Sequence, residues 1–309
     1  MKKTLLLFGI LCFCVANTVF AQKKPVKKTQ NILKTLLISD SLYADETEVT
    51  VEEWLYFVGN ILHLDGKDSA TNKLPDLRLL APQSYNLMNQ IREICKKPAD
   101  NIVTVPTPKF GDIAMPLAIA EAMNKAKESR LPGTEFPITG ITYEQAQAFC
   151  VWRTENLNTF IEENPKKAKK WKINSVQYRL PTPTEYDLMT LHAQDPNKDG
   201  NIDSVFVLKG CRLWNYSRIV GCDIDAELAQ TYGRAAMMRI ASYNPSIDGI
   251  FDILGNVAEM SSEKFISKGG HFRLPAQEGL SGTYIRYSQP EQWLGFRCIA
   301  TYEFPVEKK

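Results

Sequence analysis

The chain has 309 residues, enough for one large domain or two small ones, and 44% of them are hydrophobic and 23% charged, which excludes wholesale disorder and fibrous repeats. Lysine and arginine number 37 against 35 acidic residues, a formal net charge of +2. This small surplus provides no basic field for nucleic acid, and we expect no nucleic-acid partner.

The first 21 residues have the pattern of a signal peptide. Two lysines precede an apolar run from Leu5 to Val15, and a short segment then leads to Ala21. We expect cleavage after Ala21 and a periplasmic or secreted protein, with an uncleaved anchor as the alternative. Neither Cys12 nor Cys14 follows a small residue, so we expect no lipidation. Cleavage would leave 35 residues of each charge and no later run apolar enough to span a bilayer.

Residues 22–31 are predicted to be a basic linker, and residues 32–309 a single folded domain. Capping residues and the spacing of apolar residues predict helices over residues 50–62, 82–97, 116–129 and 142–163. Residues 102–113 are predicted to be extended. The core face of the last helix is expected to carry Ala146, Phe149, Cys150 and Trp152. After Pro181 we expect helices to give way to short strands and glycine turns, so the fold class is α+β.

Several phrases of the sequence occur in an order that resembles one known family. They are ETEVTVEEWLYF (46–57), PITGITYEQAQAFCVW (137–152), YRLPTPTEY (178–186), DILGNVAE (252–259), KGGHF (268–272) and GFRC (295–298). Together they resemble the formylglycine-generating enzyme, or sulfatase-modifying factor, domain family. The resemblance covers residues 36–301 and implies a compact, loop-rich variant of the C-type-lectin-like fold. Residues 64–135 match poorly and are interpreted as an insert.

Two arginines within these phrases lie beside apolar residues. We expect Arg179 and Arg297 to be buried structural residues anchored by carboxylates such as Glu185 and Glu259. A role in substrate binding is the alternative.

The phrase at 252–259 is the best candidate ion site. Carboxylates at Asp252 and Glu259 flank a glycine turn, and calcium is bound by carboxylate and backbone oxygens. The resemblance to the family's calcium loop implies ligation by Asp252, the carbonyls of Gly255 and Val257, and Glu259. The alternative is a turn in which Glu259 pairs with an arginine.

Two further segments are candidate calcium sites. The resemblance places a second family loop near Asn215 and Tyr216, with Asp223 or Asp225 as a guess for its carboxylate. Separately, an EF-hand-like spacing of oxygen donors is seen at Asp195, Asn197, Asp199, Asn201 and Asp203. Because Phe206 replaces the final glutamate, a polar turn is an equal alternative there.

Five cysteines remain after the signal peptide, and disulfides are expected in an exported protein. The resemblance implies a bridge between Cys150 and Cys298. Cys211 and Cys222 could close a second loop, which leaves Cys95 unpaired. Two reduced, buried thiols are the alternative for the first pair.

Catalysis in active members of the family depends on two cysteines that follow the Gly-Gly phrase, bind copper and activate oxygen. No cysteine lies between Gly270 and Tyr287, so we do not expect copper or the oxidase reaction. His63, His192 and His271 are the histidines of the chain, too few for a metal site built from several histidines.

Aromatic and basic residues remain near the active face that the resemblance implies: His271, Phe272, Arg273, Tyr284, Arg286, Tyr287 and Trp293. About half are expected to be core, and the exposed ones form the predicted partner surface. We therefore expect an exported, non-catalytic binding or scaffold protein with a protein partner in the cell envelope. Relatives include lipoproteins of gliding motility and type IX secretion, which suggests such a complex. The alternatives are a divergent metal-dependent oxidase acting on a thiol, a hydrolase, and a lectin-like carbohydrate binder.

Overall fold

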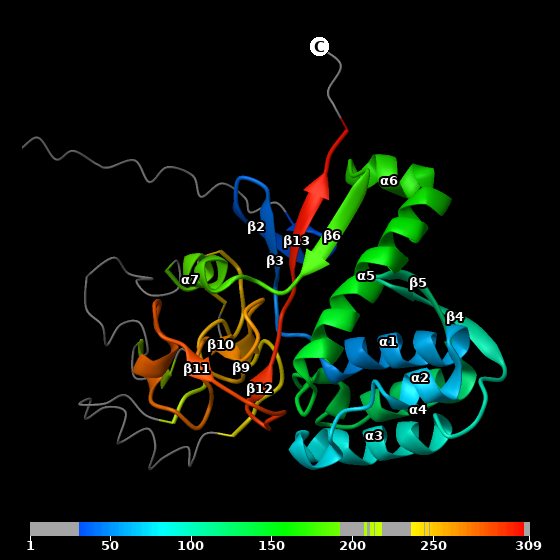
Figure 1. The fold of residues 1–309 in the computed structure, drawn as a ribbon, viewed down its shortest axis with the longest axis horizontal. Helices are drawn as coiled ribbons and strands as arrows, with labels where there is room; N and C mark the ends of the chain where they lie inside the picture. The colour runs from blue at the N-terminus through cyan, green and yellow to red at the C-terminus, as the bar shows by residue number, and fades with distance from the viewer. Residues whose placement is uncertain are drawn as a thin grey trace, which may run out of the picture.

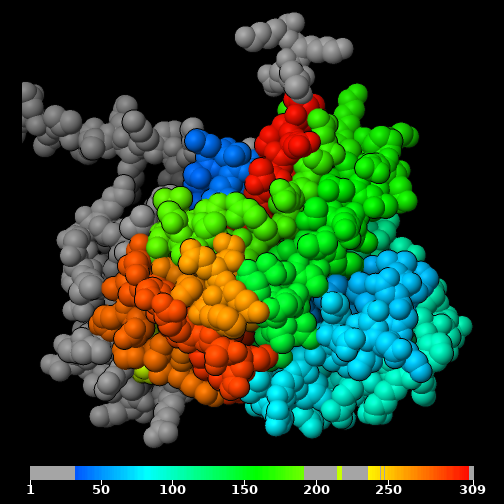
Figure 2. Space-filling view, in the orientation of Figure 1, coloured from blue at the N-terminus to red at the C-terminus, as the bar shows by residue number. Residues whose placement is uncertain are grey.

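A computed structural model describes residues 31–191, 207–208, 211–212, 214–217, 236–243, 245–246 and 248–305. Most helices gather on one side of the molecule and most short strands on the other, with a sheet and one long helix between them (Figure 1). In the space-filling view the helical part and the C-terminal part pack directly against each other (Figure 2). The predicted α+β class is confirmed.

Most helices begin where the sequence predicts. Their bounds are α1 Val51–Leu64, α2 Gly66–Thr71, α3 Pro82–Ile94, α4 Leu117–Lys127, α5 Tyr143–Glu163, α6 Pro165–Trp171 and α7 Pro183–Leu191. Thr50 forms a capping box with Glu53 at the start of α1, and Thr142 forms one with Gln145 at the start of α5. Each box satisfies backbone N–H groups that a helix start leaves without partners.

The expectation that helices fade after Pro181 is wrong for α7. Thr182 and Glu185 exchange backbone and side-chain hydrogen bonds at the start of this helix, with distances of 2.8 and 3.2 Å. Pro183 occupies its first position, where the missing N–H costs nothing. The spacing Thr-x-x-Glu is a capping signal that the sequence already contained.

The central sheet joins both ends of the chain. Its strands are β1 Asn31–Ile32, β2 Thr35–Ser39, β3 Leu42–Asp45, β6 Ser175–Arg179 and β13 Ile299–Glu303, in the order β1-β2-β3-β13-β6. The last strand, β13, lies antiparallel between β3 and β6.

The remaining strands are short. A second sheet has the order β11-β10-β9-β12, with β9 Ala258–Met260, β10 Ile266–Lys268, β11 Ile285–Arg286 and β12 Leu294–Gly295. Two hairpins complete the described strands, β4 Ile102–Thr107 with β5 Gly111–Pro116 and β7 Val207–Leu208 with β8 Cys211–Arg212. The β4–β5 hairpin accounts for the predicted extended segment.

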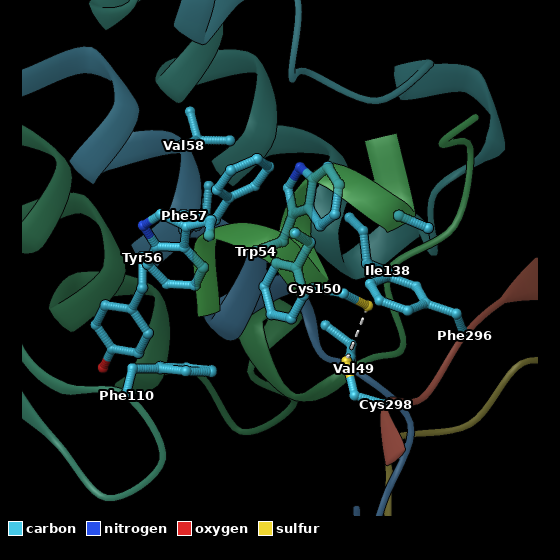
Figure 3. Packing of buried hydrophobic residues seen from close by; sticks show 14 of the residues in the cluster. Val49, Trp54, Tyr56, Phe57, Val58, Phe110, Ile138, Cys150, Phe296 and Cys298 are labelled. Atoms are coloured by element: carbon cyan, nitrogen blue, oxygen red, sulfur yellow. Dashed lines mark hydrogen bonds between the residues drawn. The ribbon is translucent and has the colours of Figure 1, made fainter. Parts of the chain in front are cut away.

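An aromatic core fastens the helices to the sheet. Trp54 of α1 stacks on Phe149 of α5 with ring centroids 5.6 Å apart, and Phe296 meets Phe149 at 5.5 Å. Figure 3 shows Trp54 and Phe296 within this core. Edge-to-face and offset pairs of this kind add to the stabilisation that burial provides. The core face expected for α5 is confirmed, since Ala146, Phe149, Cys150 and Trp152 are all buried. This core holds the loops of the second sheet in place.

Candidate functional site

Two of the family-like phrases and the Asn215–Tyr216 segment meet around Gly255. Its φ is 77°, and a Cβ at this position would lie 2.1 Å from the carbonyl oxygen of Asn215, so only glycine fits. Gly255 donates its N–H to Gly269, at 2.7 Å, and Asn256 donates its own to Asn215, also at 2.7 Å. The loop at 252–259, the Gly-Gly phrase and the segment at 215–216 are therefore in contact.

Glu259 forms a fully buried ion pair with Arg297. The guanidinium donates from Nε to both carboxylate oxygens, at 2.9 and 2.7 Å, and from Nη2 to Oε1 at 2.6 Å. It also donates to the carbonyls of Asp45 and Phe251. The predicted anchoring of Arg297 by Glu259 is confirmed.

The other predicted anchor is also present but less buried. Arg179 and Glu185 form a two-pronged contact with distances of 2.7 and 2.6 Å. The Arg179 side chain is 39% exposed, so the expected burial is wrong for this arginine. It joins the end of β6 to the start of α7.

Two further carboxylates are buried near the Glu259–Arg297 pair. Asp252 accepts a hydrogen bond from Ala241 N at 2.8 Å through Oδ2, and Glu48 accepts one from Asn256 Nδ2 at 2.9 Å through Oε1. Among the described residues, Asp252 Oδ1 and Glu48 Oε2 have no hydrogen-bond partner. Buried polar atoms of this kind are rare and call for a proton, a water molecule or an ion.

Burial shifts the titration of both carboxyl groups, and neighbouring acids add to the shift. Burial raises the pKa of Asp252 to about 6. Burial also raises the pKa of Glu48 well above its usual value, and the charge of Asp252 raises it further. The sequence reasoning missed Glu48, although it lies in the first family-like phrase.

The donor set suits a hard cation more than a soft one. The oxygens without partners, Asp252 Oδ1 and Glu48 Oε2, are of the type that calcium prefers. Glu259 is less suited to bind such a cation, because Arg297 donates hydrogen bonds to both of its carboxylate oxygens. A cation would have to share this carboxylate with Arg297. No group of three His, Cys, Asp or Glu side chains is placed to hold a metal within the described residues, so amide and backbone oxygens would have to complete such a site.

The Gly-Gly phrase itself leaves little space. The cavity between Gly269, Gly270 and the Trp214–Tyr216 segment measures about 10 Å³, which is about the volume that one water molecule needs. His271 stacks on Trp293 with ring centroids 4.5 Å apart. Burial, with the charge of Arg273, lowers the pKa of His271 to about 4. These donors do not fit copper, which requires soft thiolates in this position.

The predicted partner surface is smaller than the set of residues proposed for it. His271, Phe272 and Tyr287 are buried and belong to the core, as expected for about half of the set. The remaining members stay exposed or half-exposed: Arg273, Tyr284, Arg286 and Trp293. The Arg286 guanidinium of β11 lies 5.5 Å from the ring centre of Tyr284, the residue just before this strand, so the two side chains lie on the same side of the chain.

The predicted cysteine pair is in contact. Cys150 Sγ and Cys298 Sγ lie 3.5 Å apart in the buried core, both as free thiols (Figure 3). Burial raises the pKa of Cys298 well above its usual value, and it raises that of Cys95 to about 11. The bridge between Cys150 and Cys298 stays a prediction.

Other predicted sites fall outside the described residues. These are the EF-hand-like loop at 195–203, the carboxylates Asp223 and Asp225, and the pairing of Cys211 with Cys222. Asn215 and Tyr216 are described and buried, and the Asn215 side chain donates to Ala236 O at 2.6 Å. No described helix is both long and apolar enough to cross a bilayer.

Comparison with known proteins agrees with these phrases. The sequence profile of the sulfatase-modifying factor enzyme 1-like domain matches residues 20–302. No curated protein matches the sequence.

Several solved structures are similar in part. CarF is 14% identical, with 85% of this chain and 87% of that chain covered and a TM-score of 0.38. Variable protein 1 of Treponema denticola is 19% identical, with 56% and 74% covered and a TM-score of 0.35. PvdO from Pseudomonas aeruginosa is 14% identical, with 66% and 92% covered and a TM-score of 0.34. Similarity at this level carries no information on activity.

Proposed function

The chain belongs to the sulfatase-modifying factor enzyme 1-like domain family, and from that premise we propose that it is an exported, non-catalytic member that binds a protein partner in the cell envelope. One observation carries the proposal: the chain has no cysteine between Gly270 and Tyr287, where active members carry the pair that binds copper. Without thiolates at this place there is no ligand set for copper(I).

The geometry supports the absence of a reaction centre there. The cavity beside the Gly-Gly phrase holds about 10 Å³, which leaves no room for a peptide substrate. His271, which lines this cavity, is buried against Trp293, and burial lowers its pKa to about 4. A neutral, stacked imidazole of this kind serves packing.

The first test is the family reaction itself. The protein is incubated with copper, oxygen and a sulfatase-type cysteine peptide, and an active family member serves as the positive control. We expect no conversion of the peptide cysteine to an aldehyde. Conversion at a rate near that of the control would contradict the proposal.

The partner surface is proposed to include Tyr284 and Arg286, because an exposed aromatic–arginine pair is typical of interface centres. Wild-type protein should capture a partner from the native envelope, and a Tyr284→Ala/Arg286→Ala double variant should lose it. The matched control is Tyr85→Ala/Arg92→Ala, which removes the same residue types from the exposed side of α3. Equal capture by the two double variants would show that this surface is not used.

Calcium is proposed as a structural ion at the loop of residues 252–259. The oxygens of Asp252 and Glu48 that lack partners support the proposal, and a bound cation would offset the negative charge around them. The same cation would hold the loop against the Asn215–Tyr216 segment, which Gly255 and Asn256 already contact.

A further inference from the structure

A cavity of about 270 Å³ lies in front of the N-terminus of α1. It is enclosed by the first turns of this helix, the turn between β4 and β5, and the short 3-10 helix at Gly133–Glu135. None of the residues at 252–259 lines it, and neither does the proposed partner surface. The β4–β5 turn comes from the region interpreted as an insert, so this cavity is a separate feature of the chain.

Two buried side chains in its wall have donor groups without an acceptor. Lys109 is 8% exposed, and its Nζ pairs with Glu53 Oε1 at 2.6 Å, which leaves two of the three N–H groups of the ammonium for a ligand. The hydroxyl of Thr134 is fully buried and has no partner among the described residues. A buried donor without an acceptor costs free energy of folding. A ligand oxygen that accepts a hydrogen bond from these donors would therefore bind favourably.

The ammonium of Lys109 keeps its charge. Burial alone would lower its pKa, but the negative charges of Glu53 and Asp45 outweigh burial and raise the pKa above its usual value. A neutral ligand oxygen that accepts a hydrogen bond from Lys109 therefore forms a strong, charge-assisted hydrogen bond.

Two glutamates in the wall retain an oxygen for a ligand. The contacts to Glu52, from Tyr56 Oη at 2.6 Å and Lys127 Nζ at 2.7 Å, both fall on Oε1. Arg239 contacts Glu135 through Oε2 at 3.1 Å. The Lys127 and Arg239 side chains are 41% and 43% exposed, and exposed ion pairs of this kind contribute little, so an incoming cation can replace them.

The charges in the wall favour a ligand with a cationic group. Four glutamates line the cavity against two lysines, and these are Glu46, Glu52, Glu53 and Glu135 against Lys34 and Lys109. Lys127 and Arg239 offset Glu52 and Glu135 from outside the lining, through side chains that are 41% and 43% exposed. A cation that takes their place, next to a neutral carbonyl oxygen, would satisfy both the carboxylates and the donors of the wall. Tyr56 and Phe110, which lie side by side at the edge of the aromatic core, add an apolar surface for an alkyl stem (Figure 3).

We propose that this cavity binds a lysine or arginine side chain of a peptide segment, with the cation at Glu52 and Glu135 and a backbone carbonyl of the peptide at Lys109 and Thr134. The proposal rests on the binding role proposed above and gives the partner a chemistry. It assigns that partner a second point of attachment, on the helical side of the molecule.

The test uses the full chain and capped pentapeptides in low-salt buffer. Peptides with a central lysine or arginine should bind in calorimetric or NMR titrations. Peptides with norleucine, Nε-acetyl-lysine or glutamate at the same position should bind at least about tenfold more weakly, because they lose a charge-assisted hydrogen bond. Equal binding of the norleucine peptide would overturn the proposal, and so would binding of free lysine or glucose but of none of the peptides.

Variants sharpen the same test. Glu52→Gln and Glu135→Gln should each weaken binding of the lysine peptide about tenfold. Lys127→Met should act in the opposite direction and tighten binding a few-fold, because it removes the cation that now occupies Glu52. Lys96→Met, which removes an equally simple pair with Glu93 beyond the end of α3, is the matched control and should change nothing.

A weaker complex with Lys127→Met would overturn the proposal, since a merely structural effect would lower affinity. The outcome is separable from that of the proposed function. Loss of peptide binding with partner capture intact would reject the cavity alone. Oxidase activity would reject the non-catalytic role whatever the peptides do.

Discussion

The molecule contains two buried arginine–carboxylate pairs in very different surroundings. Arg153 donates hydrogen bonds from both Nη groups to the Asp45 carboxylate, at 2.7 and 2.8 Å. Its guanidinium carbon lies 3.8 Å from the centre of the Tyr178 ring. Arg297 grips Glu259 next to Glu48 and Asp252. All four paired side chains are fully buried.

The charge balance distinguishes them. Burial would raise the pKa of Asp45, but the charges of Arg153 and Lys109 outweigh it and lower the pKa. At the second pair one arginine faces the paired glutamate and two more acids, and the pKa values of those acids are raised. A balanced pair serves to fix the fold, whereas an unbalanced cluster requires a proton or a cation.

The largest expected effect concerns the cysteines beside the balanced pair, where Cys298 N donates to Asp45 Oδ2 at 3.2 Å. If Cys150 and Cys298 are bridged, a loop of 148 residues is closed. The double Ser variant should then lose up to about 5 kcal/mol of stability, since a bridge across so long a loop removes much of the entropy of the unfolded chain. Chemical denaturation measures the loss. Non-reducing peptide mapping checks the pairing, and a Cys150 peptide linked to Cys95 would contradict it.

Breaking either ion pair comes next. Arg153→Met and Arg297→Met should each destabilise the fold by about 3–5 kcal/mol, because an unpaired buried carboxylate remains. The Arg297 variant should regain stability when Glu48→Gln is added, because the neutral amide reduces the charge left behind. Urea unfolding of the single and double variants measures this coupling. An equal gain from Glu48→Gln in the Arg153 background would show that the two regions do not differ.

A smaller effect is expected from the pH dependence of His271, which lies beside Gly255 and the Gly-Gly phrase, next to the second region. The pKa of His271 is about 4 in the folded state, against about 6.5 unfolded, so the unfolded chain binds more protons between these values. Relative to His271→Phe, the wild type should therefore lose stability as the pH falls from 6.5 to 4, by about 3 kcal/mol at most. Denaturation midpoints at pH 7.5 and 4.5 measure it. A constant difference between the two proteins would mean that the imidazole stays as basic as in water.

The smallest effect is that of calcium. If it binds at Asp252, calcium at about a hundredfold excess over its dissociation constant should stabilise the protein by about 2.7 kcal/mol, and chelator should remove that gain. Asp252→Asn should abolish most of the stabilisation by calcium. The matched change Asp112→Asn, at an exposed position of β5, should not alter it. If a chelator does not shift the melting curve, calcium is not bound at this site. The buried carboxyl groups would then be neutralised by a proton instead.

Local signals in the sequence were sufficient for much of the fold. The caps at Thr50 and Thr142 predicted the starts of α1 and α5, because they satisfy N–H groups a few residues away. The pairing of Arg297 with Glu259 followed from residue type, since a charge beside apolar neighbours needs an opposite charge when buried. The helix α7 was missed although its capping box was present, because one proline lies just before it and a second occupies its first position.

Contacts between distant residues were beyond the reach of these signals. Glu48 meets Asn256 across 208 positions of sequence, and the cavity of Lys109 and Thr134 depends on a hairpin folded over the first turns of α1. Caps and periodicity depend on neighbours along the chain, so the sequence by itself determined the four longest described helices, the family and the missing thiolates. Which acids share one buried volume, and which donors are left without acceptors, depends on packing, and the tertiary structure alone decided it.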